Sequence, residues 1–292
     1  EAHEAGVDIV KYQTAQLNEL VSKRAEMAEY QKKNIGTDES QVDMLKKLLL
    51  TFDEFDELFD YCNEIGIVPL STPFDIKSIK YLSEKNMPFW KIPSGEITNL
   101  PYLLAIAETG KPVVMSTGMS DLTEVEAAVK VFQDNGVKDI TLLQCNTEYP
   151  TPFEDVNLNA MLTMKEQFGL PVGYSDHTRG IEISLAAAAM GAEVIEKHFT
   201  LDRNMEGPDH KASLEPDELK KMVTCIRDIE KAMGNGEKVP SPSEIKNKDI
   251  ARKSIIAKCN ICKGELFTEQ NITTKRPGNG VSPMKWFDVL GT

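Results

Sequence analysis

Residues 171–200 read PVGYSDHTRGIEISLAAAAMGAEVIEKHFT, and this stretch decides the fold. It contains two short apolar runs that pass into polar residues, PVGYSDHT (171–178) and EVIEKHFT (193–200), with an Ala-rich helical pattern between them. Two strands joined by a helix form a βαβ unit, and its strands run parallel in one sheet. The stretch therefore predicts a parallel α/β protein.

The same pattern recurs upstream. Five more apolar runs are each followed by polar residues or Gly and then by a helical pattern: VDIVKYQT (7–14), IVPLSTPF (67–74), FWKIPSGE (89–96), PVVMSTGM (112–119) and DITLLQCN (139–146). Doubly wound sheets usually have about five or six strands, so seven strands nearly complete a (β/α)₈ barrel. Because the chain opens on EAHEAG, which is helix-like and has no initiator Met, we expect the first barrel strand to be missing from it.

Three helices have clear limits in the sequence. They are residues 40–66, which end at Gly66; the segment from an Asp121/Glu124 capping box to Gly136; and the segment from Pro216 to Gly234.

The composition changes near the C-terminal end. Residues 238–252, KVPSPSEIKNKDIAR, are rich in Pro, Ser and charge and are predicted to be a linker. The following residues have short β-like pieces, Gly turns and no long helix. We therefore expect a barrel domain at 1–237 and a small β domain at 253–292.

Several classes of protein are excluded. A net charge of −13 argues against nucleic-acid binding, which needs a basic face, and no apolar run approaches the ~20 residues of a membrane span. The first residues lack the apolar core of a secretory signal, so a cytoplasmic location is expected. Five cysteines without a disulfide framework's spacing are expected to be reduced, and Cys259 and Cys262 are interpreted as structural.

Each predicted strand ends in polar residues, and in a barrel these ends meet on one face. His177 and His198 occupy equivalent positions at the ends of two consecutive strands. Two neutral imidazoles with water and a carboxylate suit Mn²⁺, Fe²⁺ or Zn²⁺. The spacing therefore predicts a metal pair.

The other strand ends indicate a site for a small anion. Cations could come from Lys11, Lys91, Arg252 and Arg276, and hydroxyl donors from Thr72, Ser94, Ser116 and Ser175. Glu196 and Asp209 lie close to the histidines in sequence, and either could orient a ligand, bind sugar hydroxyls or move protons. A local group of cations in an acidic protein favours a small phosphorylated substrate.

The motifs KYQT, STPF, KIPSGE, MSTGMS, YPTPFEDVNL, GYSDHTRG, EKHFTLDR and GPDHKASLEP resemble, in order, those of the NeuB-type sialic acid synthases. The later RPGNGVSPM resembles the motif of their C-terminal SAF, or antifreeze-like, domain. The resemblance covers nearly the whole chain. It implies a (β/α)₈ barrel joined to a small β-clip domain, in a homodimer whose SAF domains each cap the partner's barrel.

The resemblance also implies roles for individual residues. His177 and His198 match the metal ligands, with Mn²⁺ expected and Mg²⁺ or Co²⁺ as alternatives, and Glu196 and Asp209 are the catalytic candidates. The positions that match phosphoenolpyruvate (PEP) contacts are Lys11, Thr72, Lys91, Ser94, Ser116, Asn146, Thr147, Ser175 and, less directly, Arg252. The positions that match sugar contacts are Gln13, Phe74, Glu96, Asp209 and Arg276, the last of which matches an arginine inserted from the partner subunit.

The implied reaction condenses PEP with an open-chain N-acylated mannosamine-type sugar and releases phosphate by C–O cleavage. The product is a nine-carbon 2-keto acid. The stretch CNTEYPTP (145–152) looks closer to legionaminic acid synthases than to N-acetylmannosamine users. A 2,4-diacetamido-6-deoxy sugar is therefore the preferred substrate, with N-acetylmannosamine as the alternative.

The chain departs from the family pattern at both ends. Nothing in residues 1–10 can supply the acidic residue of the family's first strand, and the SAF-like segment ends soon after WFDVLGT. Two other functions therefore stay open. One is a barrel that binds ligand without turnover, and the other is a related synthase that joins PEP to a phosphorylated aldose.

Overall fold

The computed structural model describes residues 1–22, 25–36 and 40–292, which form two compact units, Glu1–Met233 and Gly234–Thr292. Each unit is described by itself. The first unit contains all seven predicted strands, and each is confirmed: β1 (Ile9–Thr14), β2 (Val68–Pro73), β3 (Trp90–Ile92), β4 (Val113–Ser116), β5 (Ile140–Cys145), β6 (Val172–Asp176) and β7 (Ile195–Lys197).

The strands pair only in parallel within this unit. β3 to β7 form a five-stranded sheet in sequential order, and β1 pairs with β2. Sequential order in a parallel sheet requires a crossover between neighbours, and helices supply each of them. In the described part of the chain no ladder joins β2 to β3, so the curled sheet is not a closed eight-stranded barrel.

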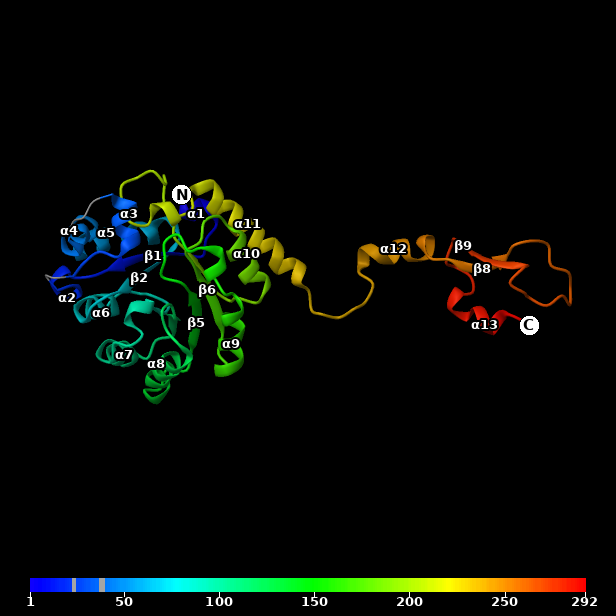
Figure 1. Cartoon of the computed structure of the whole chain (residues 1–292), viewed down its shortest axis with the longest axis horizontal. Coiled ribbons are helices and arrows are strands. Elements are labelled where there is room, and N and C mark those ends of the chain that lie inside the picture. Colours follow the sequence, from blue (N-terminus) through cyan, green and yellow to red (C-terminus); the bar gives the residue numbers. More distant parts are fainter. Residues whose placement is uncertain (23–24, 37–39) are drawn as a thin grey trace. The chain divides into compact units, whose positions relative to one another are not determined.

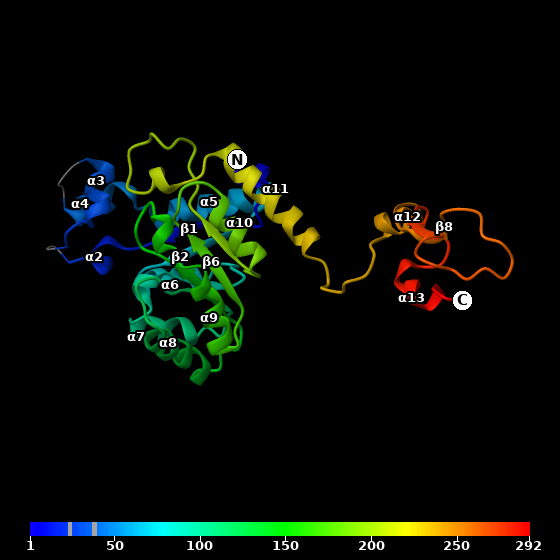
Figure 2. The same cartoon turned by 45° about the vertical axis from the view of Figure 1, so that its right-hand side comes forward.

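Helices cover the outside of the strands (Figures 1 and 2). The crossover helices are α5 (Phe52–Ile65), α6 (Ile76–Ser83), α7 (Leu100–Ala107), α8 (Leu122–Asp134), α9 (Asn159–Phe168) and α10 (Glu182–Ala189). β4 is buried at every position, as expected for a parallel strand covered on both faces. The core between strands and helices includes Trp90, Tyr102 and Phe132, each almost fully buried.

Two helical predictions are confirmed and one is wrong in part. The Asp121/Glu124 capping box opens α8, and Pro216 opens α11 (Pro216–Met233). Residues 40–66, however, form two helices, α4 (Gln41–Leu48) and α5. Thr51 separates them because it caps α5: its hydroxyl accepts from the Glu54 N–H, and the Glu54 carboxylate accepts from the Thr51 N–H at 2.7 Å.

Short helices complete the first unit. They are α1 (Ala2–Ala5), α2 (Leu17–Leu20) and α3 (Glu29–Ile35). The opening EAHEAG segment is thus helical, as predicted, and α1 packs against α11. Among the described residues, no helix is long and apolar enough to cross a membrane.

The second unit contains one antiparallel pair, β8 (Ser254–Ala257) with β9 (Ile272–Lys275), and the short helix α13 (Trp286–Val289). Most of the predicted linker, residues 238–252, is helical. Residues 242–251 form helix α12 (Pro242–Ala251), because Ser241 and Glu244 make a capping box and Pro242 occupies the first turn. The second unit begins at Gly234.

Gly173 permits the close approach of β6 to β7. A Cβ atom at this position would lie 2.3 Å from the carbonyl oxygen of Val194 and 2.6 Å from Cδ2 of Leu143. Gly173→Ala is therefore expected to lower the free energy of unfolding by about 1–3 kcal/mol. Denaturant unfolding followed by tryptophan fluorescence measures the change. It is done in a Trp286→Phe background, so that the signal comes from the buried Trp90 of the first unit. Gly95→Ala, where no atom lies within 4 Å, is the control; equal stabilities of the two variants would contradict the expectation.

Candidate active site

Three strands bring charged side chains together. The Glu196 carboxylate, on β7, forms ion pairs with two lysines. Its Oε1 lies 3.4 Å from Nζ of Lys11 on β1, and its Oε2 lies 3.4 Å from Nζ of Lys91 on β3. Lys91 is 4% exposed and also donates to Oγ of Ser116, at the end of β4, at 2.6 Å. Residues far apart in sequence therefore form one polar cluster at the carboxyl ends of the strands.

The cluster carries an excess of positive charge. Burial alone would raise the pKa of Glu196, but Lys11 and Lys91 lower it to about 2. Burial lowers the pKa of Lys91, and Glu196 opposes that shift. Two ammonium groups therefore share one carboxylate, which leaves the cluster suited to an anionic ligand.

His177 and His198 follow β6 and β7, and their ring centroids are 5.3 Å apart. The backbone carbonyl of Asn146 accepts from Nδ1 of His177, which leaves Nε2 of that ring as the electron-pair donor. Burial lowers the pKa of His177, and burial together with His177 and Lys11 lowers that of His198 to about 3. Both rings are therefore neutral near pH 7, which is the form that binds metals.

Asp209 approaches the pair from the loop after β7. Its Oδ2 is 3.9 Å from Nδ1 of His198, and its Oδ1 is buried and has no hydrogen-bond partner among the described residues. Burial raises the pKa of Asp209 to about 6. This carboxyl group can therefore hold or release a proton near neutral pH.

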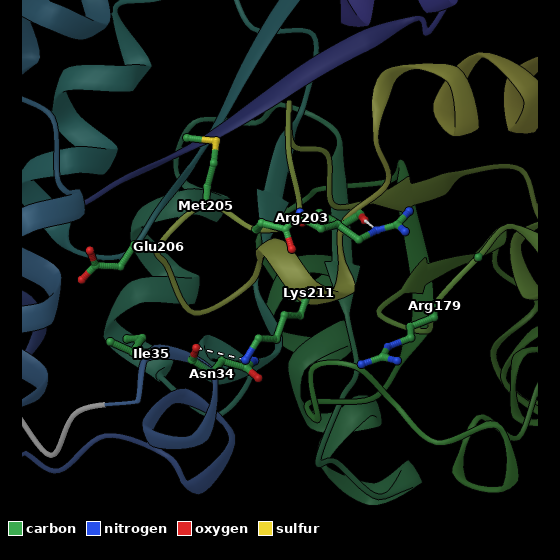
Figure 3. A pocket seen from close by; sticks show the side chains of 10 residues that line it. Asn34, Ile35, Arg179, Arg203, Met205, Glu206 and Lys211 are labelled. Carbon is green, nitrogen blue, oxygen red and sulfur yellow. Dashed lines mark hydrogen bonds between the residues drawn. The ribbon is translucent and has the colours of Figure 1, made fainter.

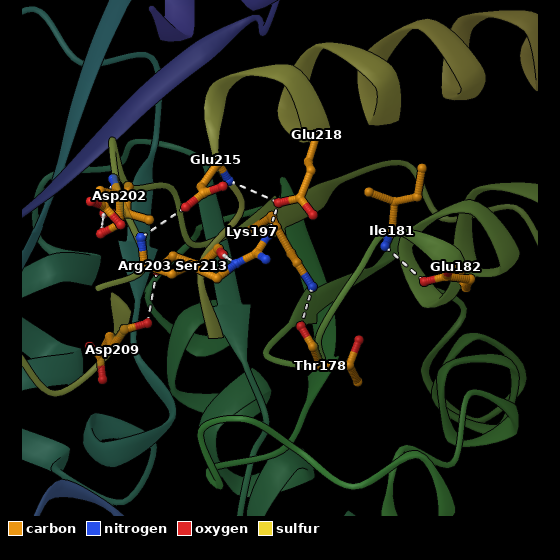
Figure 4. A network of polar contacts seen from close by, with 11 residues as sticks. Thr178, Ile181, Glu182, Lys197, Asp202, Arg203, Asp209, Ser213, Glu215 and Glu218 are labelled. Atoms are coloured by element: carbon orange, nitrogen blue, oxygen red, sulfur yellow. Dashed lines mark hydrogen bonds and ion pairs between the residues drawn. The ribbon is translucent and has the colours of Figure 1, made fainter. Parts of the chain in front are cut away.

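The loop that carries Asp209 is tied to α11 by Arg203 (Figure 4). Nε of Arg203 donates to the carbonyl of Ser213 at 3.0 Å, and its guanidinium pairs with Glu218. The Ser213 hydroxyl in turn donates to the Asp209 carbonyl at 2.8 Å. Arg203 thus supports the backbone on which Asp209 stands.

The histidines form a two-residue donor set. In the described residues no group of three His, Cys, Asp or Glu side chains is close enough to hold a metal ion. Two neutral imidazoles alone nevertheless suit a divalent cation that takes its other ligands from water or substrate. His177 and His198 could hold such an ion.

An aromatic residue that the sequence analysis did not single out contacts both histidines. The ring of Tyr149 lies 4.1 Å from that of His177 and 5.5 Å from that of His198, centroid to centroid. Asn34 donates to the carbonyl of Tyr149 at 3.0 Å. Tyr149 belongs to the stretch CNTEYPTP (145–152), but nothing in that stretch indicates that its ring contacts the histidines.

Other predicted site residues lie around Gly118, at the end of β4. A Cβ atom on Gly118 would meet the Ser94 hydroxyl and the Thr147 methyl at 3.2 and 3.0 Å, so these side chains converge on it. Oγ of Ser175 is 3.5 Å from Nε2 of His177. Oγ1 of Thr72 is buried, and within the described ranges 1–22, 25–36 and 40–292 it has no hydrogen-bond partner. Ser94 and Thr147 therefore lie next to Gly118, and Ser175 lies next to His177.

The side-chain hydrogen bonds of the remaining predicted residues are with groups outside the cationic cluster and the histidine pair. The Asn146 amide donates to the Asp155 carbonyl at 2.7 Å, and Glu96 accepts from Asn99 at 2.6 Å. Gln13 is exposed and Phe74 half-buried. Arg252 and Arg276 belong to the second unit, where Nε of Arg276 donates to the Ala251 carbonyl at 2.9 Å. Nothing in the first unit's geometry therefore tests these two arginines.

A cavity of about 560 Å³ opens beside the loop that carries Asp209 (Figure 3). Arg179 and Lys211 line it, and the Lys211 ammonium points toward Asn34. Lys211 donates to the carbonyl of Asn34, the residue that also binds Tyr149. The cavity is thus connected to the histidines through Asn34 and Tyr149.

The family model described as "NeuB family" matches residues 1–238. The chain belongs to the NeuB family. It is 55% identical to the N,N'-diacetyllegionaminic acid synthase of Campylobacter jejuni, over 99% of this chain and 87% of that protein. It is 44% identical to the enzyme of the same name from Legionella pneumophila, over 100% of this chain and 83% of that protein.

A solved structure of this family has the same fold. The N-acetylneuraminic acid synthetase of Leptospira borgpetersenii, in complex with citrate, superposes with a TM-score of 0.73 at 34% identity, over 84% of this chain and 81% of that chain. The predicted family is thereby confirmed. The predicted α/β fold is confirmed at the level of a parallel curled sheet, and the NeuB relatives support activity as a sialic-acid-type synthase.

The charge balance of the cluster gives a direct prediction. Lys91→Met removes one of the two cations that stabilise the Glu196 carboxylate, so the pKa of Glu196 should rise from about 2 toward its usual 4.5. A ¹³C NMR titration of the Glu side-chain carboxyls measures it. Lys77→Met, which breaks only an exposed pair with Glu19, is the control. An unchanged Glu196 pKa in Lys91→Met would show that Lys91 does not stabilise this carboxylate.

Proposed function

We propose that the protein condenses PEP with an open-chain N-acylated mannosamine-type sugar to give a nine-carbon 2-keto acid and phosphate. The observation that carries the proposal is the adjacency of two sites. A cationic cluster around Glu196 suits a small phosphorylated anion, and a neutral histidine pair lies next to it. Each site meets a requirement of one of the two substrates.

PEP is expected to bind at the cluster. Lys11 and Lys91 would pair with its phosphate and carboxylate, and Ser116, already bonded to Lys91, would donate to the same oxygens. Ser94, Thr147, Ser175 and the unpaired Thr72 hydroxyl extend this donor set, with Asn146 beside them. Such fixed donors position the substrate and stabilise charge in the transition state.

His177 and His198 would hold a divalent cation, for which Mn²⁺ is proposed and Mg²⁺ or Co²⁺ are alternatives. When bound, such a cation supplies Lewis acidity to the carbonyl oxygen of the sugar aldehyde. The Asn146 carbonyl fixes the orientation of His177, as partners of metal-binding histidines commonly do.

The two carboxyl groups differ in what they can do during the reaction. The enol carbon of PEP attacks the aldehyde, positive charge develops at C2 of PEP, and water adds there before phosphate leaves with its bridging oxygen. Glu196 stays ionised because its pKa is about 2, so it would stabilise that positive charge and orient the water. Asp209, with a pKa of about 6, would deliver a proton to the alkoxide that forms from the aldehyde.

The preferred sugar is a 2,4-diacetamido-6-deoxy mannose analogue, with N-acetylmannosamine as the alternative. Two relatives named N,N'-diacetyllegionaminic acid synthase support this choice, at 55% and 44% identity. Gln13, Phe74, Glu96 and Asp209 are the proposed sugar contacts. The second unit is proposed to be an SAF domain that brings Arg276 to the N-acyl group of a sugar in the partner's site within a homodimer.

Phosphate release with Mn²⁺ tests the proposed activity. The protein should release phosphate from PEP with the diacetamido sugar faster than with N-acetylmannosamine, and not with a phosphorylated aldose. PEP labelled with ¹⁸O at the bridging position should yield ¹⁸O-phosphate, because the C–O bond breaks. No release with either N-acyl sugar, or unlabelled phosphate, would refute the proposal.

His177→Ala is expected to abolish metal-dependent turnover while the protein keeps its far-UV circular dichroism, because one of two imidazole ligands is lost. His3→Ala, on the short helix α1, is the matched control and should retain full activity. Unchanged turnover in His177→Ala would remove this residue from the ligand set.

A further inference from the structure

A buried ion pair joins the ends of β6 and β7, just before the two histidines. Nζ of Lys197 is 3.0 Å from Oδ2 of Asp176, and neither side chain is more than 1% exposed. The two residues are register partners on β7 and β6, and each directly precedes a histidine, His198 and His177. Both stand at strand ends, where the sequence analysis expected residues with chemical roles, but they pair with each other instead.

The pair is embedded in a network that encloses His177. Oδ1 of Asp176 accepts from the N–H and the hydroxyl of Thr178 at 2.8 and 2.7 Å. Its Oδ2 also accepts from the Ser184 hydroxyl at 2.6 Å. Lys197 donates to the Thr178 carbonyl at 2.6 Å (Figure 4). The residues on both sides of His177 are therefore tied to β7 at the position just before His198.

Stability alone is a weak explanation for this arrangement. Burying an ion pair removes two charges from water, and that cost offsets much of their attraction, so an apolar pair could hold two strands together equally well. What the charged groups add here is several simultaneous hydrogen bonds to Thr178 and Ser184, which an apolar pair could not make. The ion pairs that the described residues make with Glu196, the carboxylate of the cationic cluster, come from Lys11 and Lys91 instead.

We propose that Asp176 and Lys197 are positioning residues that set the separation and orientation of the two imidazoles for one divalent cation. The inference rests on the metal site of the proposed function. Groups that orient metal ligands typically change metal affinity by about 10–100-fold when they are removed.

Titration of the full chain with Mn²⁺, in the absence of PEP and sugar, tests the proposal. Lys197→Met keeps the aliphatic stem and removes the ammonium group. Its Kd for Mn²⁺, measured from free Mn²⁺ by electron paramagnetic resonance, should rise about 10–100-fold. In turnover, the Mn²⁺ concentration for half-maximal rate should rise while the KM for PEP stays near the wild-type value.

Two further variants separate positioning from general stability. Leu82→Ala opens a cavity in the core under α6, away from the histidines, and should lower stability without changing the Kd for Mn²⁺. Lys197→Met leaves Asp176 unpaired and could unfold the protein. The double variant Asp176→Asn/Lys197→Met removes both charges, so it should fold and still bind Mn²⁺ at least about tenfold more weakly than wild type.

Wild-type affinity for Mn²⁺ in either the single or the double variant would overturn the proposal, as would a wild-type chain that binds no Mn²⁺. If only the proposed function is wrong, the result is different. The Kd for Mn²⁺ would still rise in Lys197→Met, but the wild-type chain would release no phosphate from PEP.

Discussion

The parallel pairing of β6 with β7 is the constraint on which the rest of the site depends. Ser175 lies opposite Glu196, and Asp176 lies opposite Lys197. His177 and His198, which directly follow these two strand ends, are therefore brought side by side. Side chains alternate across a strand, so a slip of one residue would exchange the face that carries Glu196 with the face that carries Lys197. The close contact at Gly173 and the buried Asp176–Lys197 pair both oppose such a slip.

The cationic cluster depends on the same strand. Glu196 lies on β7, and its carboxylate offsets the cost of burying Lys91 while it also holds Lys11. One carboxylate cannot neutralise two ammonium groups, so positive charge remains where the strands end. In a protein with a net charge of −13, this local group of cations suits the proposed small anion, which the average field would repel.

Much of this arrangement could be predicted from the sequence. Seven apolar runs gave all seven strands, and the equivalent strand-end positions of His177 and His198 predicted that their rings would meet. Two features could not be predicted, because they depend on side-chain direction: Tyr149 turns its ring onto the histidines, and Asp176 and Lys197 face each other. The capping box of Thr51 and Glu54, in contrast, is a sequence pattern, and it divides a stretch that the helical period alone predicted to be one helix.

PEP and a divalent cation are proposed to meet at these strand ends, and one diffraction experiment tests this most directly. Crystals of the protein grown with Mn²⁺ and PEP, measured at the manganese absorption edge, should show an anomalous peak bonded to the imidazoles of His177 and His198. The PEP phosphate or carboxylate should lie against Lys11 and Lys91. A manganese peak elsewhere, or PEP bound away from the two lysines, would contradict the account.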